Sequence, residues 1–419
     1  MREDSAGMHV GAVTTPKIAL VMVGLPARGK SYIARKLARF LRWLGHETRV
    51  FNVGSYRRTF VGSQKTHEFF DPANPEGLAE RKRVAMLALD DLIKWTEGDG
   101  QIGIYDATNS TRERRAMIRE RCEAAGLKVA FIETVCDDPA VIERRVRETK
   151  LRSPDYAGLP EEDAVRDFLQ RVHHYESVYQ TVEDDEGRYV KLVDEGEKVV
   201  VHRIDGNILS RAVFFLMNLR TKPRSLYMVR HGESVFNVED RIGGDSELSP
   251  RGRAFAKSLA AFMETKREPG EPFSIWTSRL KRTIQTAEQI SGEARSFRQL
   301  DEIDAGVCDG MTYAEVKRRF PEDFAIRARD KLNYRYPRGE SYTDLIQRLE
   351  RVIIEIERHD APILIVGHQG VLRALYAYVM DTPPKECPHL PMPLHTVIEL
   401  VPNAYGCDER RFPLAALGT

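Results

Sequence analysis

Apolar positions in the first half of the chain fall into two alternating patterns. Short strand-favouring runs occupy residues 18–23, 46–52, 101–106, 127–134, 189–193 and 198–204. Between these runs, apolar residues recur at helical spacing over 33–44, 75–95, 111–125, 140–150, 161–180 and 207–219. Strands that alternate with helices predict an α/β domain with a mainly parallel sheet. Ligands of such domains bind at the carboxyl ends of the strands.

A second set of short apolar runs begins near residue 225. The runs lie at 225–229, 273–276 and 363–367, and each ends in polar residues. A chain of 419 residues has room for two or three domains. We expect a flexible tail over residues 1–16, a first domain over 17–220, a linker over 221–224 and a second α/β domain over 225–419.

The segment between the first strand and the first helix fits the phosphate-loop pattern G-x-x-x-x-G-K-[ST]. Its residues are Gly24, Leu25, Pro26, Ala27, Arg28, Gly29, Lys30 and Ser31. Backbone N–H groups of such a loop surround phosphate oxygens, and the next helix adds its positive end. Lys30 offers a cation to the outer phosphates, and Ser31 offers Mg²⁺ a hydroxyl ligand. The alternative interpretation is a glycine turn between core elements.

Polar residues after two further strands predict the rest of a phosphate-transfer site. Asp106 ends one strand, where an acid can hold Mg²⁺ or accept a proton from an attacking hydroxyl. Arg57 and Arg58 lie in a stretch, residues 53–72, that is too polar and broken for a core. The arginine pair suits an anionic substrate, but a solvated pair explains it equally well. Arg81 is open to the same two interpretations.

The second half carries a different phosphate chemistry. Arg230 and His231 follow one short strand, and His368 follows another. A neutral imidazole can attack phosphorus and form a phosphohistidine, with Arg230 and Arg282 stabilising the phosphoryl oxygens in the transition state. Glu302 lies among apolar neighbours, and a carboxyl buried there stays protonated and can protonate a leaving oxygen. No metal is needed for this chemistry.

Composition narrows the function classes. The chain is 42% hydrophobic and 30% charged with a net charge of +1, so nothing favours nucleic acid or a membrane as partner. The sequence has no run as long as a membrane helix, no signal-peptide core and no Gly-x-Ser-x-Gly elbow. Its five cysteines are scattered and odd in number, which argues against a disulfide framework. We therefore expect a cytoplasmic protein.

Longer motifs make residues 17–407 resemble the bifunctional 6-phosphofructo-2-kinase/fructose-2,6-bisphosphatase family. In the family's order they are Gly-Leu-Pro-Ala-Arg-Gly-Lys at 24–30, Phe-Asn-Val-Gly at 51–54, Asp-Ala-Thr-Asn at 106–109, Thr-Arg-Glu-Arg-Arg at 111–115, Val-Cys-Asp-Asp-Pro at 135–139, Arg-Ile-Gly-Gly-Asp-Ser at 241–246, Glu-Ile-Asp-Ala-Gly-Val-Cys at 302–308 and Arg-Tyr-Pro-Arg-Gly-Glu-Ser-Tyr at 335–342. The resemblance implies a P-loop kinase domain with a mainly parallel sheet, followed by a histidine-phosphatase (phosphoglycerate mutase-like) α/β domain.

For the first domain, the resemblance implies that ATP and Mg²⁺ are used to phosphorylate fructose 6-phosphate. The ATP site matches residues 24–31 and 145–150, including Arg145 and Lys150, and the metal candidates are Ser31 and Asp106. Matches to catalytic residues are Lys30, Asp106, Cys136 and Lys150. Matches to sugar-binding residues are Arg57, Arg58, Arg81, Thr108, Arg114, Lys150, Arg171 and Tyr175. For the arginine pair, the resemblance favours substrate binding.

For the second domain, the resemblance implies hydrolysis of fructose 2,6-bisphosphate without a cofactor. His231 matches the nucleophile and Glu302 the proton donor, while Arg230, Arg282 and His368 match the phosphate pocket. Further matches to residues that hold the bisphosphate are Asn237, Gly243, Tyr313, Arg327, Lys331, Tyr342, Gln369 and Arg373. Together the two activities would control glycolysis and gluconeogenesis. The family is commonly dimeric, so we also expect a homodimer.

Three positions depart from the family pattern. Ser31 replaces the usual threonine, Arg145 stands where animal forms tend to have asparagine, and Gly367 replaces a common cysteine. One alternative is that one domain dominates or is inactive, which leaves a single-function phosphosugar kinase or phosphatase. Others are a phosphoglycerate mutase-like second domain, a metabolite-sensing scaffold and a nucleic-acid end-processing enzyme. The near-neutral charge disfavours the last of these.

Overall fold

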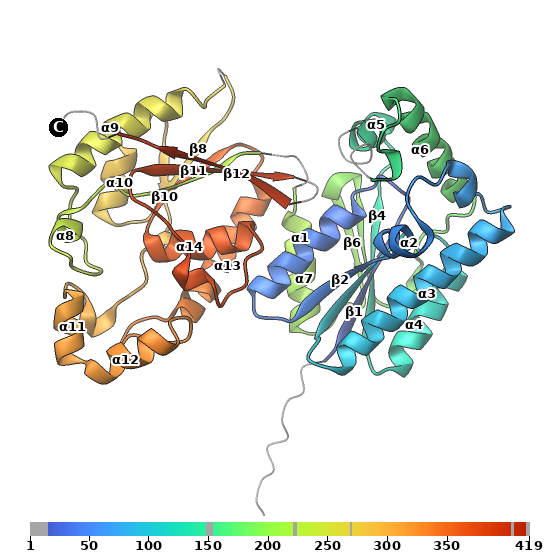
Figure 1. Ribbon diagram of the computed structural model, residues 1–419, viewed down its shortest axis with the longest axis horizontal. Coiled ribbons are helices and arrows are strands. Elements are labelled where there is room, and N and C mark those ends of the chain that lie inside the picture. The colour runs from blue at the N-terminus through green and yellow to red at the C-terminus, as the bar shows by residue number, and fades with distance from the viewer. Residues whose placement is uncertain (1–15, 148–153, 221–223, 269, 404–405, 416–419) are drawn as a thin grey trace, which may run out of the picture. The chain divides into compact units, whose positions relative to one another are not determined.

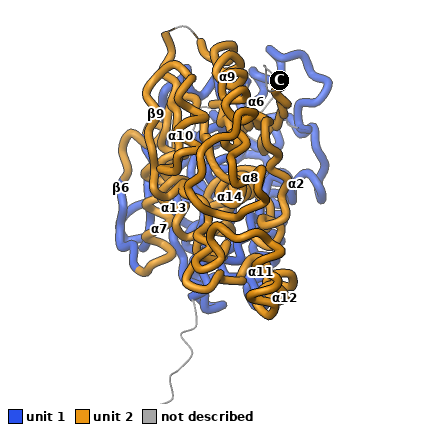
Figure 2. Tube along the Cα trace, turned by 90° about the vertical axis from the view of Figure 1, so that its left-hand side faces the viewer, with its two compact units in different colours: residues 1–34, 46–193, 200–205 blue, residues 35–45, 194–199, 206–419 orange. Residues whose placement is uncertain are grey.

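The computed structural model describes residues 16–147, 154–220, 224–268, 270–403 and 406–415. The chain divides into two compact units, coloured separately in Figure 2. The first comprises residues up to 34 together with 46–193 and 200–205, and the second comprises 35–45, 194–199 and 206 onward. The expected tail over 1–16 and linker over 221–224 fall mostly outside the described residues.

A six-stranded sheet forms the centre of the first unit (Figure 1), in the order β2-β3-β1-β4-β5-β6. The four pairings from β2 to β5 are all parallel. The strands are β1 (Ile18–Val23), β2 (Thr48–Asn52), β3 (Ile102–Asp106), β4 (Lys128–Val135), β5 (Tyr189–Val193) and β6 (Lys198–His202). The expected mainly parallel sheet is confirmed.

Helices pack on this sheet because their apolar faces need cover. The helices are α1 (Lys30–Trp43), α2 (Val53–Val61), α3 (Pro75–Glu97), α4 (Arg112–Ala124), α5 (Pro139–Arg145) and α6 (Glu161–Glu176). Short 3-10 helices are η1 (His67–Phe70), η3 (Pro154–Tyr156), η4 (Asp184–Glu186) and η5 (Asp194–Gly196). The core joins strand residues such as Val21, Phe51 and Phe131 to Leu89 of α3 and Ile118 of α4. Helix α1 continues past Ala34 into the second unit.

A second six-stranded sheet lies in the second unit, in the order β12-β11-β7-β10-β8-β9. Strand β10 pairs in parallel with β7 and β8, β9 pairs in parallel with β8, and β11 runs antiparallel to β7 and β12. The strands are β7 (Leu226–Arg230), β8 (Ser274–Thr277), β9 (Ala294–Ser296), β10 (Ile363–Gly367), β11 (Thr396–Asn403) and β12 (Gly406–Pro413).

Helices and short 3-10 helices connect the strands of the second unit. They are α7 (Asn207–Asn218), α8 (Val235–Val238), α9 (Pro250–Glu264), α10 (Lys281–Ala287), α11 (Tyr313–Arg319), α12 (Pro321–Arg329), α13 (Tyr342–Arg358) and α14 (Gln369–Val379), with η6 (Arg298–Leu300), η7 (Gly306–Cys308) and η8 (Cys387–His389). The core contains Val229, Leu364 and Val366 from the sheet with Phe255 and Leu259 from α9.

The expectation for residues 53–72 is wrong. This stretch forms α2 and η1, and both Arg57 and Phe70 are buried, at 4% and 3% exposed. Arg57 is buried because a buried carboxylate, Asp155, accepts its hydrogen bond. The helix expected over 161–180 ends at Glu176, and of the helix expected over 140–150 the described part is α5.

Candidate active sites in the two units

The phosphate loop connects β1 to α1 and makes close backbone contact with β4. The N–H of Gly24 donates to the carbonyl oxygen of Thr108 at 3.0 Å. Gly24 has a φ of +134°, and a Cβ there would lie 2.5 Å from the carbonyl oxygen of Thr134. A side chain at this position is therefore excluded both by backbone conformation and by space. The glycine in the sequence pattern is required by the fold as well as by a phosphate.

Asn52, at the end of β2, brings the two predicted metal-binding oxygens together. Its Nδ2 donates to Oγ of Ser31 at 3.4 Å and to Oδ2 of Asp106. Oxygen donors are the ligands that Mg²⁺ prefers, so the donor set fits that ion. Lys30 is buried, at 8% exposed, and its Nζ donates to the carbonyl oxygen of Leu25 at 2.5 Å. All of these groups are close to the phosphate loop.

The other predicted nucleotide and catalytic residues have different surroundings. Nη1 of Arg145 lies 3.1 Å from the place that a Cβ on Gly29 would occupy, so its guanidinium flanks the loop. Arg28 is turned away from solvent, where its Nη1 donates to the carbonyl oxygen of Pro26 and its Nη2 to Glu176. Cys136 is buried just after β4. Lys150 lies outside the described residues.

Three of the predicted sugar-binding arginines surround one buried carboxylate, Asp155. Nη2 of Arg57 donates to Oδ2 of Asp155, while Arg58 and Arg171 approach the same oxygen at 3.8 and 3.9 Å. Three cations around one anion leave an excess of positive charge. The cluster therefore suits a further anion such as a sugar phosphate.

The remaining sugar-binding candidates of the first unit lie around Phe70 or at the end of β3. Arg171 stacks on the ring of Phe70 at 3.6 Å, and the ring of Tyr175 is 6.3 Å away. Arg81 donates to the carbonyl oxygen of Phe70 at 2.9 Å. Beyond β3, Nε of Arg114 donates to Asn109, and Thr108 accepts the bond from Gly24 already described.

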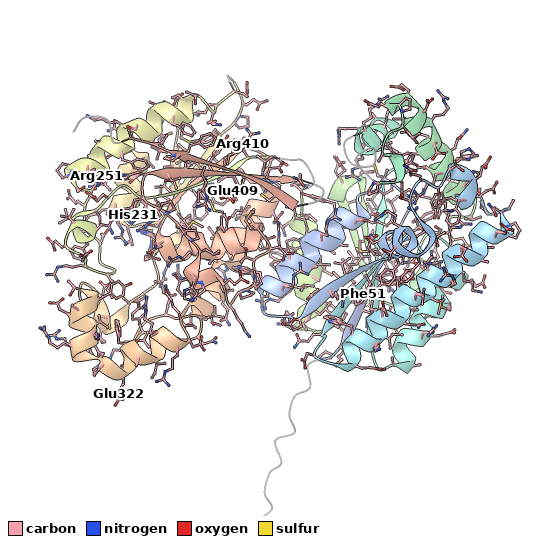
Figure 3. The ribbon with its side chains drawn as sticks, in the orientation of Figure 1. Phe51, His231, Arg251, Glu322, Glu409 and Arg410 are labelled. Carbon is pink, nitrogen blue, oxygen red and sulfur yellow. The ribbon has the colours of Figure 1, made fainter. Side chains whose placement is uncertain are left out.

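His231 is fixed in one tautomer at the end of β7 in the second unit (labelled in Figure 3). Its Nδ1 lies 2.8 Å from the carbonyl oxygen of Gly232, which can only accept, so Nδ1 carries the proton. Nε of Arg282 donates to Nε2 of His231 at 3.1 Å. These two bonds assign the lone pair to Nε2 and place a guanidinium directly beside it.

His368 lies next to His231, with ring centroids 5.2 Å apart. Its Nε2 is 2.8 Å from Oγ of Ser278, and its buried Nδ1 has no hydrogen-bond partner among the described residues. Nη1 of Arg230 donates to the carbonyl oxygen of Met392, and its buried Nε likewise has no partner within the described part of the chain. Two buried nitrogens beside His231 can bind a ligand that offers oxygen acceptors.

Burial keeps both histidines neutral. Burial, followed by the charge of Arg282, holds the pKa of His231 well below its usual range. The same two causes, in the same order, lower the pKa of His368 well below the usual range. A neutral imidazole with a free lone pair is the form that attacks phosphorus, so the electrostatics of the pocket favour the nucleophilic state.

The expectation that Glu302 is buried is wrong, because the structure leaves it partly exposed. It lies in the loop after η6, where Oε1 accepts from the N–H of Ile303 at 2.9 Å. Both carboxyl oxygens also accept from the N–H of Gly370, at 3.2 and 3.3 Å, in the first turn of α14. Glu302 is thus held next to the start of α14, two residues after His368.

Four predicted bisphosphate-binding residues form one basic group. Nζ of Lys331 donates to the carbonyl oxygen of Pro388, and Nη1 of Arg373 donates to the hydroxyl of Tyr342 at 3.3 Å. Burial, together with the charges of Arg373 and Arg327, lowers the pKa of Lys331 to about 8. Since the two arginines help to lower the pKa of Lys331, an anionic ligand among these cations would be strongly favoured.

The last four matches contribute mainly structure or lie at the edge of this group. Asn237 caps α8, with Oδ1 accepting from the N–H of Ser234 at 3.0 Å. Gly243 has a φ of +68°. The guanidinium carbon of Arg327 lies 5.3 Å from the centroid of the Tyr313 ring. Gln369 is the first residue of α14, directly after His368.

Comparisons with known proteins show which family the chain belongs to. A family model described as 6-phosphofructo-2-kinase matches residues 5–223, and one described as histidine phosphatase superfamily (branch 1) matches residues 226–413. A 6-phosphofructo-2-kinase/fructose-2,6-bisphosphatase 4 of Rattus norvegicus is 50% identical over 93% of this chain and 83% of its own length. The chain belongs to the 6-phosphofructo-2-kinase/fructose-2,6-bisphosphatase family.

Two further likenesses differ in coverage. A 6-phosphofructo-2-kinase/fructose-2,6-bisphosphatase of Arabidopsis thaliana is 51% identical over 98% of this chain, and the chain spans 55% of that relative's length. A match to the solved structure of a mycobacterial glucosyl-3-phosphoglycerate phosphatase covers 45% of this chain and 97% of the phosphatase chain, at 27% identity and a TM-score of 0.38.

Within this 6-phosphofructo-2-kinase/fructose-2,6-bisphosphatase family member, several residues at the two sites were missed at the level of sequence. Asn52 hydrogen-bonds to Ser31 and Asp106. Asp155 forms an ion pair with Arg57, and Ser278 hydrogen-bonds to His368. Asn52 lies within the Phe-Asn-Val-Gly motif and Ser278 within Ser-x-Leu-x-Arg-Thr, so their motifs were the available signal. Along the described part of the chain, no helix combines the length and the apolar character needed to cross a membrane.

Proposed function

We propose that this chain both makes and hydrolyses fructose 2,6-bisphosphate, as the names of its relatives describe for those proteins. The first unit would transfer the γ-phosphoryl group of ATP to the 2-hydroxyl of fructose 6-phosphate. The second would remove that 2-phosphate. The observation that carries the proposal is the tautomer of His231, whose unprotonated Nε2 lies beside Arg282 in a chain that also has a complete phosphate loop.

In the kinase reaction, residues of the first unit hold both substrates and take up one proton. Lys30 and the loop amides hold the outer phosphates, a phosphate oxygen replacing the Leu25 carbonyl as acceptor for Lys30. Asp106 accepts the proton of the attacking 2-hydroxyl. Ser31 and Asp106 would hold Mg²⁺, which would supply positive charge to the transferred phosphoryl group. Lys150, Arg145 and Cys136 keep the roles that the family resemblance implies, as part of this proposal.

The sugar phosphate would bind among the arginines of the first unit. Arg57, Arg58 and Arg171 all approach one carboxylate, that of Asp155, and the side chains of Arg57 and Arg58 are 4% and 31% exposed. The 6-phosphate would supply the second anion, with Arg81 and Tyr175 on the neighbouring Phe70 platform. Thr108 and Arg114, after β3, would contact the sugar near the transferred phosphoryl group.

In the phosphatase reaction, the Nε2 lone pair of His231 attacks the 2-phosphorus and the bond to the sugar oxygen breaks. In this proposal Glu302 keeps the role of general acid that the family resemblance implies, and its proton goes to that oxygen as it leaves. Arg282, Arg230 and Nδ1–H of His368 donate to the phosphoryl oxygens in the transition state. Water then attacks the phosphohistidine, the carboxylate of Glu302 accepts a proton from it, and phosphate is released.

The basic group of the second unit would orient the rest of the bisphosphate. Arg327, Lys331 and Arg373 offer cations to the 6-phosphate, and Tyr342 and Tyr313 offer hydroxyls. Asn237, Gly243 and Gln369 would border the same space. We also propose that the protein is cytoplasmic, as its five free cysteines favour, and that it forms the homodimer common in its family.

The experiment measures two rates on one preparation of the unaltered chain. Synthesis is followed from fructose 6-phosphate and Mg-ATP, and hydrolysis of fructose 2,6-bisphosphate is followed with a chelator present. Both rates should exceed those of a heat-inactivated sample. A chain that performs only one reaction would support the single-function alternative, and a chain that performs neither would refute the proposal.

A further inference from the structure

The 3-10 helix η1 supports three of the proposed sugar-binding residues. The guanidinium of Arg171 lies 3.6 Å from the ring centroid of Phe70, and Tyr175 contacts the same ring. Arg81 donates to the carbonyl oxygens of Phe70 and Asp71 at 2.9 and 3.1 Å. A displacement of η1 would therefore move these three proposed sugar-binding residues relative to the rest of the site.

Two imidazoles fasten η1 to α6. Nδ1 of His67, the first residue of η1, lies 3.2 Å from Nε2 of His174 on α6. The two rings are nearly parallel, with centroids 5.5 Å apart and an angle of 18° between their planes. The backbone N–H of His67 also donates to Oδ1 of Asp167 at 2.8 Å. The sequence places these histidines 107 residues apart, so only the fold reveals the pair.

The contact between the two ring nitrogens depends on the number of protons. One nitrogen must carry a hydrogen and the other must present a lone pair, as neutral or singly protonated pairs can do. When both imidazoles are protonated, every ring nitrogen of His67 and His174 carries a hydrogen. The two N–H groups then face each other and two like charges repel. Imidazoles are the side chains that exchange protons in the physiological pH range.

Two carboxylates contact residues of the pair. Oδ1 of Asp71, in the loop after η1, lies 3.9 Å from Nδ1 of His174, and Asp167 of α6 holds the backbone of His67. Arg171 lies on the same helix as His174, and Arg81 of α3 reaches the carbonyl oxygen of Asp71. The sugar-binding arginines are thus linked to the pair through the same short segment.

We propose that His67 and His174 are positioning residues for the kinase reaction, forming a proton-sensitive latch that holds η1 in the sugar-binding arrangement. The inference rests on the proposed kinase function. Protonation of both imidazoles opens the latch, so the affinity for fructose 6-phosphate falls as the pH falls. Neither imidazole takes part in phosphoryl transfer, so kcat at saturating sugar and the KM for ATP stay constant.

The test compares the KM for fructose 6-phosphate at about pH 7.5 and about pH 6 in four proteins. They are the unaltered chain, His174→Leu, His174→Gln and the control His173→Gln. The control changes the neighbouring histidine, whose side chain is 83% exposed on the same helix. The glutamine amide at position 174 can donate or accept at either pH, so it keeps the latch without titrating.

Loss of one hydrogen bond predicts a change in KM of about fivefold. His174→Leu should raise the KM by that factor at both pH values, with an unchanged kcat. Between the two pH values, the KM of the unaltered chain and of His173→Gln should rise more than the KM of His174→Gln, with about fivefold as the limit for complete loss of the bond. Dividing by the His174→Gln ratio removes the titration of the sugar phosphate itself.

Several outcomes would overturn the latch while leaving the proposed function intact. In one, His174→Leu is active and its KM for fructose 6-phosphate equals that of the unaltered chain at both pH values. Another is a KM that falls at low pH relative to His174→Gln, since added charge would then simply attract the phosphate. A parallel loss of kcat and of ATP affinity would show a general structural defect instead. If the unaltered chain shows no kinase turnover, the proposed function fails and the latch fails with it.

Discussion

A buried carboxylate, Glu357 of α13, offers a direct test of the energetics of the second unit. It accepts hydrogen bonds from Nζ of Lys36 at 2.6 Å, Nη2 of Arg39 at 2.9 Å and the hydroxyl of Tyr378 at 2.6 Å. Glu357 is only 1% exposed. We expect Glu357→Gln to destabilise this unit, because it leaves two buried cations without the carboxylate between them.

The magnitude can be worked out in two ways. Removing one partner of a buried ion pair costs about 3 to 5 kcal/mol. Burial alone would raise the pKa of Glu357, but Lys36 and Arg39 outweigh it and lower the pKa from 4.5 to about 2. At about 1.4 kcal/mol for each pKa unit, that difference corresponds to about 3 kcal/mol. Burial lowers the pKa of Lys36 to about 8, which offsets part of this stabilisation, so we take the lower end of the ion-pair figure, a loss of about 3 kcal/mol.

The sign of the pH dependence follows from the same shift. Because the folded pKa is lower than the unfolded one, the stabilisation is fully present above about pH 4.5 and is lost as the pH falls toward about 2. The Glu357→Gln variant should lack this part of the acid sensitivity.

The assay is urea unfolding at neutral pH, followed by tryptophan fluorescence and by phosphatase activity in parallel samples. Trp43 is a suitable reporter because its Nε1 donates to the carbonyl oxygen of Ala374 and its ring contacts Tyr378, a partner of Glu357. Glu355→Gln, which removes an exposed ion pair with Arg358 on the same helix, is the matched control and should cost under about 1 kcal/mol. A loss below about 1 kcal/mol for Glu357→Gln as well would refute the reasoning.

Three more predictions concern single features of the two sites. Gly24→Ala should abolish kinase activity and spare phosphatase activity, because its Cβ would clash with Thr134. A variant that keeps the kinase rate of the unaltered chain would contradict this. Arg115→Lys should destabilise the first unit by about 3 kcal/mol, since Arg115 is fully buried and forks onto both oxygens of Glu186, as thermal inactivation of the kinase rate can measure. The lowered pKa of His231 keeps the nucleophile unprotonated, so phosphatase kcat should fall less than about twofold between about pH 7 and about pH 5.5, whereas a free imidazole would lose about eightfold of its neutral form; a fall of about eightfold in a pH profile would argue against burial as the cause.

Features that are local in sequence could be predicted well. The phosphate loop is eight consecutive residues between a strand and a helix, so its place at the end of β1 was predictable. His231 and His368 could be placed because they directly follow β7 and β10, which pair in parallel. Parallel strands end at one edge, which brings such residues together.

Features that depend on tertiary contacts could not be predicted from the same patterns. The burial of Arg57 depends on Asp155, 98 residues later, and that of Glu357 on Lys36, 321 residues earlier. Glu302 was expected to be buried from its apolar neighbours in sequence, but the N–H of Gly370, in another segment, holds it in a partly exposed position. Charged residues are buried where partners meet them in space, and hydrophobic periodicity carries no information about those partners.

The central claim is that two separate sites act on one sugar phosphate, and reciprocal inactivation tests it most directly. Lys30→Ala and His231→Ala would each be assayed for synthesis and for metal-independent hydrolysis of fructose 2,6-bisphosphate. We predict that Lys30→Ala loses synthesis by at least about a hundredfold and keeps hydrolysis, and that His231→Ala shows the opposite pattern. Loss of both activities in either variant, or the retention of hydrolysis in His231→Ala, would contradict the account.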